Sequence, residues 1–236
     1  MKNLFLFSLL LALFASCEKG YRIEGCVDGD ILDGMPVYVK SEINGAVVKL
    51  DSAVVGKSRF FMAGSTDSSF ITSLYIGEQP VVPFVVEPGR IDIHISEEQV
   101  SVKGTPLNNE LWTLMQQKME LERRMYELER AETAMILDGA TAEAAAEYMG
   151  DSITYIGESM EMLMNGFIRA NLDNILGPCV FALFYSAVNI PIVTGELESI
   201  YNDAPDMFRN DSFVKYYYEI ARENSRRLRQ GGLNEE

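Results

Sequence analysis

The hydrophobic pattern of this chain changes from strand-like to helix-like at Gly104-Thr105-Pro106, and this change decides its fold class. Before it, short apolar runs alternate with turn sequences. In the clearest run, Arg90–Ile95, isoleucine occupies every second position and alternates with Asp92 and His94. After it, apolar residues recur at helical spacing. Strands first and helices second predict an α+β protein.

Residues 21–103 are predicted to form an N-terminal antiparallel β-sandwich or barrel. Asp33-Gly34 and Asn44-Gly45 are turn sequences, and the second is a strong hairpin signal. Asp92 and His94 are expected to point outward. The expected strands cover residues 36–40, 46–50, 59–63, 70–76, 81–86 and 90–95.

Residues 104–236 are predicted to form a helical bundle packed on the β-domain. Thr194 is expected to cap a short helix that ends near Tyr201, and Asp211 is expected to open the last helix. The stretch Val180–Val188 is almost purely apolar, so we expect it to be covered on all sides, partly by the sheet, in one cooperative unit. The other expected helices cover residues 107–137, 141–171 and 178–189.

The first residues are typical of a secretory signal peptide, predicted to span residues 1–16. Lys2 precedes an apolar run from Leu4 to Ala15, too short for the roughly 20 residues of a membrane span. Ala15-Ser16-Cys17 is similar to a bacterial lipobox. We therefore expect residues 17–20 to be a lipidated N-terminus, with Cys17 carrying acyl chains such as palmitate. The alternative is a soluble secreted product.

The expected location is the bacterial cell envelope, as an outer-membrane lipoprotein that faces the periplasm. The formal net charge of −15, from 35 acidic and 20 basic residues, argues against nucleic acid as a partner because both would be negative. Membrane lipid, through the acylated Cys17, is the expected partner. The sequence contains no glycine-rich phosphate loop, and no cofactor is expected.

Residues that could carry catalysis or bind metal are sparse. His94 is the single histidine, which disfavours Ser-His-Asp, Cys-His and zinc sites; an exposed surface histidine is the preferred interpretation. Asp28, Asp30 and Asp33 are similar to part of a calcium loop, but their spacing fails and a solvated turn is favoured. No catalytic or metal-binding residue is therefore assigned, and the ligand-binding residues are unknown.

Sulfur-containing residues offer two further alternatives. Cys26 and Cys179 could form a long-range disulfide, although two buried free thiols are the preferred interpretation. Without a Cys-x-x-Cys pair, this chain is not expected to exchange disulfides on its own. Met160, Met162 and Met164 could form an adaptable binding surface, but helical spacing favours a place in the core.

The order and spacing of several short segments resemble a known family. It is the N-terminal domain of unknown function that precedes the thioredoxin-like domain in many Bacteroidetes lipoprotein thiol–disulfide oxidoreductases. The resemblance implies the anchored, non-catalytic half of such a protein, because no Cys-x-x-Cys domain follows before Glu236. The segments that carry it are residues 33–39, 50–55, 59–64, 84–93, 102–108 and 171–177.

These observations favour a non-catalytic, lipid-anchored envelope protein that acts as a binding or interaction module for an unknown ligand. A first alternative is an accessory or docking half for a separate thioredoxin-like envelope protein. A second is a carboxylate-based hydrolase, since a catalytic pair among 35 acidic residues cannot be located from sequence.

Overall fold

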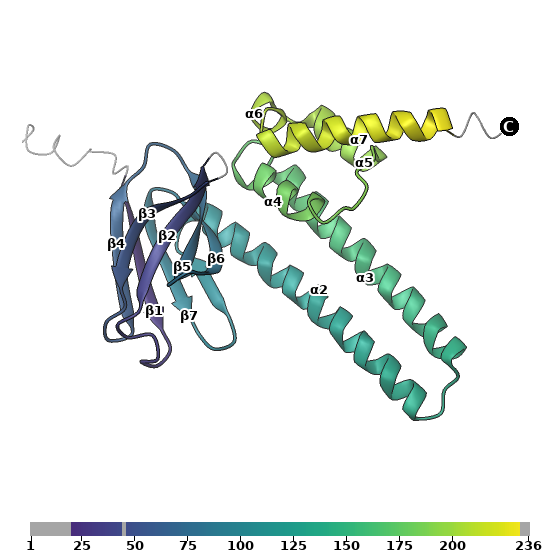
Figure 1. Cartoon of the computed structure of the whole chain (residues 1–236), viewed down its shortest axis with the longest axis horizontal. Helices are drawn as coiled ribbons and strands as arrows, with labels where there is room; N and C mark the ends of the chain where they lie inside the picture. Colours follow the sequence, from purple (N-terminus) through teal and green to yellow (C-terminus); the bar gives the residue numbers. More distant parts are fainter. Residues whose placement is uncertain (1–19, 44–45, 232–236) are drawn as a thin grey trace, which may run out of the picture. The chain divides into compact units, whose positions relative to one another are not determined.

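The computed structural model describes residues 20–43 and 46–231. The chain divides into two compact units, one ending at Asn109 and the other beginning at Glu110. The first contains the strands, and the second contains all the helices except the first turn of the longest (Figure 1). The α+β prediction of a β-sandwich followed by helices is therefore confirmed.

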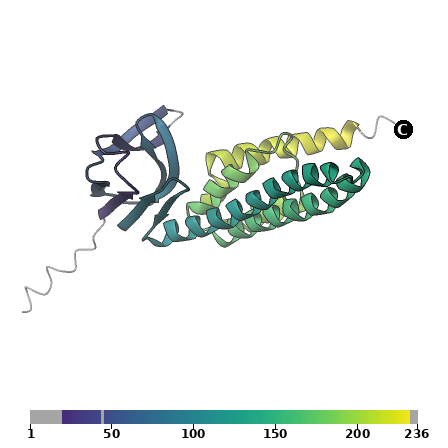
Figure 2. The same ribbon diagram turned by 90° about the horizontal axis from the view of Figure 1, so that it is seen from below.

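The strands of the first unit form two four-stranded sheets (Figures 1 and 2). One has the order β4-β1-β7-β8, with bounds Arg59–Ser65, Gly20–Val27, Gly89–Ile95 and Val100–Lys103. The other has the order β3-β2-β5-β6, with bounds Ala46–Val54, Pro36–Ile43, Phe70–Ile76 and Gln79–Val86.

One pair of strands departs from the expected antiparallel arrangement. β1 and β7 are parallel, with Tyr21 opposite Gly89 and Val27 opposite Ile95. The strand pattern did not single out β1, in which glycine takes the inward position 25, or β8, which has only four residues. The hairpin expected at Asn44-Gly45 lies outside the described residues, but the strands on either side of it pair antiparallel.

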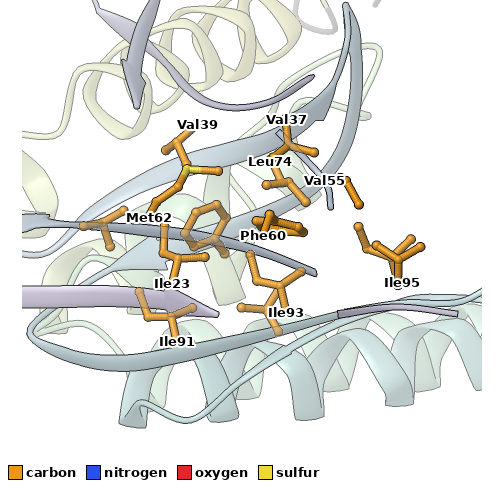
Figure 3. Close-up of a cluster of buried hydrophobic side chains, with 14 residues drawn as sticks. Ile23, Val37, Val39, Val55, Phe60, Met62, Leu74, Ile91, Ile93 and Ile95 are labelled. Atoms are coloured by element: carbon orange, nitrogen blue, oxygen red, sulfur yellow. The ribbon is translucent and has the colours of Figure 1, made fainter. Parts of the chain in front are cut away.

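The core of this unit lies between the two sheets, where fourteen buried apolar side chains meet (Figure 3). Ile91, Ile93 and Ile95 all point into it, which confirms the alternation read from β7. Phe60 of β4 lies opposite Gly25 of β1, where an added Cβ would come within 2.1 Å of the phenyl ring. Only glycine at position 25 leaves room for this ring.

The β6 edge of the second sheet is closed by the start of helix α2, Pro106–Leu137, within the first unit. The buried Asn108 side chain accepts a hydrogen bond from the Val85 N–H at 2.9 Å and donates to the Val85 carbonyl at 2.8 Å. Its amide also donates to Thr105 Oγ1 at 2.8 Å. The Asn108 side chain thus satisfies both backbone groups of Val85, which a neighbouring strand would otherwise bond.

Glu87, which follows β6, fixes the same helix start. Its Oε1 accepts hydrogen bonds from the backbone N–H groups of Leu107 at 2.9 Å and Asn108 at 3.3 Å. A carboxylate is favourable there, because the first N–H groups of a helix lack partners within it and its N-terminus is partially positive. Glu87 and Asn108 together tie the end of the sheet to the first turn of α2.

The second unit contains the rest of α2 and the remaining helices. Its buried Phe181 ring contacts Phe208 and Tyr217 from the last two helices. The Thr194 hydroxyl accepts from the Leu197 N–H at 3.1 Å, and Asp211 Oδ1 accepts from the Val214 N–H at 3.1 Å. Both predicted helix starts are therefore confirmed. The helices are α3 Ala142–Ala170, α4 Leu176–Tyr185, α5 Gly195–Asp203, α6 Asp206–Arg209 and α7 Ser212–Gly231.

The apolar segment predicted as a helix over residues 178–189 is shifted and less covered than expected. Helix α4 begins at Leu176, which places Pro178 in its first turn, where proline is tolerated. Leu183 and Val188 are exposed, so the prediction that every side is covered is wrong. An exposed leucine within an apolar run shows that hydrophobicity alone does not determine burial.

Helices α2 and α3 form a long antiparallel hairpin (Figures 1 and 2). Gly139, with a φ of 97°, lies in the turn, and the Thr141 hydroxyl caps α3 by accepting from the Ala144 N–H at 3.2 Å. Beyond Leu114, none of the described side chains of α2 is buried. No helix among the described residues is long and apolar enough to cross a membrane.

Candidate binding site

The outer face of the second sheet carries a cluster of two lysines and two tyrosines. The Lys40 ammonium lies 4.5 Å from the Tyr75 ring centroid and 5.1 Å from that of Tyr38. Lys49, its cross-strand neighbour, lies 5.6 Å from the Tyr38 ring. Two like charges in directly opposed positions are unfavourable, and the negative ring faces offset part of this repulsion. We call these four residues the lysine–tyrosine cluster.

The two lysines differ in their surroundings. The Lys40 side chain is only 12% exposed, and its ammonium lies 3.0 Å from the Glu78 carboxylate. Lys49 is exposed and makes no ion pair with any other described residue. It is therefore an available cation on a chain whose formal charge is −15.

A pocket of about 310 Å³ opens beside Lys40, where β2 and β5 diverge. The Ser41 hydroxyl donates to the Ile71 carbonyl at 3.0 Å, and the Thr72 hydroxyl donates to the Lys40 carbonyl at 2.8 Å. These bonds hold the two strands together at the end of their regular pairing. The pocket combines hydroxyl groups, a tyrosine and Val47, which are groups that bind a small polar or partly apolar ligand.

Strand β3 borders this pocket and forms the other edge of the sheet. Its residues from Ala46 to Leu50 are exposed, and within the described part of the chain no strand pairs with its outer side. The pairing with β2 shifts register between Asp51 and Lys49, and Asp51 Oδ1 accepts from the Ser52 N–H at 2.7 Å. Bulges and charges of this kind limit edge-to-edge aggregation. The segment before Leu50 remains open.

The single histidine has a partner that sequence reasoning missed. His94 Nε2 lies 2.8 Å from Asp28 Oδ1, with both side chains exposed. This exposure agrees with the interpretation of a surface histidine. The pair comes from β7 and the turn after β1, which are neighbours only because those strands are parallel.

The aspartates compared with a calcium loop have separate structural roles. Asp33 accepts hydrogen bonds from the backbone N–H groups of Lys57 at 3.0 Å and Ser58 at 2.7 Å. Both of those residues have positive φ angles, 52° and 59°, so Asp33 stabilises a strained turn. Asp28 contacts His94 instead. Among the described residues, no group of three or more potential ligands could hold a metal ion.

The structure corrects the expected burial of one cysteine. Cys26 and Cys179 are both free, but Cys26 is exposed because its neighbours Gly25 and Val27 take the inward positions of β1. Cys179 is half-buried in α4, and this burial raises the pKa of its thiol to about 11. A thiol with so high a pKa is a poor nucleophile at neutral pH.

The three methionines also divide. Met164 is buried, which confirms its predicted position in the core. Met162 is 74% exposed on α3, so the predicted core position is wrong for this residue. A spacing of two residues turns a helix by about 200°, which places these two side chains on opposite faces.

Two carboxyl groups have displaced pKa values. Hydrogen bonds from Arg123 and Arg124 lower the pKa of Glu120 to about 2, and Arg227 and Arg226 lower that of Glu223. A carboxyl group that acts as a general acid requires a raised pKa. These two groups therefore give no support to the hydrolase alternative.

Comparison with known proteins finds a similarity for the first unit that carries no assigned activity. A search of the curated proteins found no match. Residues 21–111 match a family model described as Domain of unknown function (DUF4369), which covers the sandwich from Tyr21 onward and the first six residues of α2. The matched region includes Glu87 and Asn108, so the tie between sheet and helix lies inside it. Residues 21–111 of this chain are thus similar to the DUF4369 domain.

Proposed function

We propose that this protein is a non-catalytic, lipid-anchored protein of the bacterial cell envelope, whose DUF4369 domain binds an extended, acidic segment of another envelope protein. The segment would pair with β3 between Ala46 and Lys49, as an added strand. The observation that carries the proposal is the available Lys49 ammonium on this open edge, which a carboxylate of the partner would neutralise. Val47 and the pocket would receive an apolar side chain.

The binding test uses a photo-reactive amino acid at Val47 in cells that produce the lipoprotein. We expect a specific cross-linked product that Lys49→Glu abolishes and Lys49→Arg retains, because only the charge is reversed in the first variant. Lys215→Glu, on the exposed surface of α7, is the matched control and should leave the product unchanged. A product that survives Lys49→Glu would contradict the proposed site.

The anchor is tested separately. Cys17 lies outside the described residues, and its lipidation rests on the Ala15-Ser16-Cys17 sequence and the short apolar run before it. We expect Cys17→Ala to move the protein from the outer-membrane fraction to the soluble fraction, with loss of acyl mass from the N-terminal peptide. Unchanged fractionation would exclude this anchor while leaving the binding test valid.

A second candidate function is that of a docking partner for a separate thioredoxin-like envelope protein. It is supported by the resemblance of residues 33–39, 59–64 and 84–93 to the domain that precedes thioredoxin-like domains in envelope oxidoreductases. The family match over residues 21–111 carries no assigned function. The same cross-linking experiment distinguishes the two. Identification of a Cys-x-x-Cys protein in the Val47 product would support the docking role, and a partner without that motif would contradict it.

A further inference from the structure

Three large side chains form an exposed row on helix α3. Tyr148, Tyr155 and Met162 are 56%, 65% and 74% exposed, and they recur every seventh residue. Seven residues are close to two helical turns, so the three side chains lie on one face over about 21 Å. Isolated exposed apolar residues are normal, but a heptad-spaced row is the pattern of a helix-packing surface.

Small residues alternate with the large ones on the same face. Ser152, Ser159 and Gly166 also recur every seventh residue, each four positions after a member of the row. Two hollows lie along it. One, of about 510 Å³, lies between α2 and α3 and includes Ser152 and Tyr155; the other, of about 370 Å³, includes Met162 and Gly166.

The row is complementary to itself when its direction is reversed. In two antiparallel copies centred at the level of Gly157, each large side chain meets a small one. Tyr148 is opposite Gly166, Tyr155 is opposite Ser159, and Met162 is opposite Ser152. We infer that the α3 helices of two copies of this chain pack antiparallel in this register, with a two-fold axis at Gly157.

Charges do not set this register. Arg124 lines the 510 Å³ hollow together with Glu127 and Asp151, and its guanidinium lies 3.0 Å from Glu120 of the same helix. The register therefore rests on the match of large and small side chains.

The same packing covers the part of α2 that the single chain leaves open. Leu128 and Ala131 line the hollow and are only half-buried, as are the other inward positions of α2 beyond Leu114. A helix of the second copy placed in the hollow covers them. Two hairpins then form an antiparallel four-helix bundle, in which apolar positions of all four helices share one core.

The first experiment measures the mass of the protein in solution by sedimentation velocity. The sample lacks residues 1–16 and carries Cys17→Ser, so it retains every described residue. We expect a dimer at about 10 µM protein, and we expect Tyr155→Asp to raise its dissociation constant at least tenfold. Tyr216→Asp is the matched control, since Tyr216 is 62% exposed on α7 and lies outside the row. A monomer at every concentration, or a dimer indifferent to Tyr155→Asp, would overturn the inference.

The second experiment tests the register. Two differently tagged copies, one with Met162→Cys and the other with Ser152→Cys, are mixed and oxidised in a Cys26→Ser background. We expect a mixed disulfide between them. Gly157→Cys in place of Ser152→Cys is the control, because position 157 lies on another face of the helix and should not react. Preferential disulfides between two Met162→Cys copies would indicate a parallel pairing and refute the proposed axis.

Discussion

The β-sandwich and the distal α2–α3 hairpin both have periodic sequences, but their apolar faces are covered to different degrees. In the sandwich, fourteen apolar side chains from two layers bury one another. In the hairpin, α2 has no buried side chain among its described residues beyond Leu114. Periodicity therefore identifies the apolar face of an element but does not identify what covers it.

The two edges of the second sheet show the same contrast at a smaller scale. The β6 edge is closed by Asn108, whose amide takes the place of a strand. The β3 edge has only a bulge and the Asp51 side chain, and its first residues stay open. Shortening a side chain that is covered by other residues should therefore lower the free energy of unfolding more than shortening an exposed one.

The largest difference is expected between two adjacent phenylalanines of β4. Phe60 is fully buried and Phe61 is 59% exposed. Phe60→Ala should lower the free energy of unfolding by about 3–5 kcal/mol, through lost burial and the cavity left behind, and Phe61→Ala by less than about 1 kcal/mol. Hydrogen exchange of the β1 and β7 amides measures both. Equal losses would mean that the sandwich is less tightly closed than its burial indicates.

A smaller difference is expected along α2. Leu114 is buried, whereas Leu128 is half-buried beside the 510 Å³ hollow. Leu114→Ala should cost about 2–4 kcal/mol, and Leu128→Ala about 1 kcal/mol or less in the monomer. Denaturant unfolding at low protein concentration gives these values. A concentration-dependent loss at Leu128 would connect this position to self-association.

The smallest effect is expected at the edge closed by Asn108. Asn108→Ala leaves the buried Val85 N–H and carbonyl without their side-chain partner, at a cost of about 1–3 kcal/mol. Asn109→Ala, at the exposed neighbour that accepts from the Gly104 N–H, should cost less than about 1 kcal/mol. Protection of the Val85 amide against hydrogen exchange provides the readout. Unchanged protection in Asn108→Ala would show that water or a nearby group replaces the amide.

Local features of this fold could be predicted from sequence because their causes are local. The alternation of Ile91, Ile93 and Ile95 follows from the two-residue period of a strand. The helix starts at Thr194 and Asp211 follow from the ability of short polar side chains to accept from nearby N–H groups. These interactions involve residues at most three positions apart.

Other features depend on residues far apart in the chain. The parallel pairing of β1 with β7 brings Asp28 to His94. The packing of Gly25 and Val27 into the core between the sheets leaves Cys26 facing solvent. The lysine–tyrosine cluster was missed for the same reason, since Tyr38 and Tyr75 meet only across strands. A cross-strand pair of lysines beside aromatic residues was the signal available, but recognising it required the register of β2 with β3.

The start of β1 has a consequence for how such a protein would move at a membrane. β1 begins at Gly20, three residues after Cys17, and a chain of three residues reaches at most about 11 Å. If Cys17 carries lipid, this short connection keeps the sandwich close to the bilayer surface. Its search for a partner is then largely two-dimensional, and segments of other proteins that lie close to the membrane are the ones it encounters.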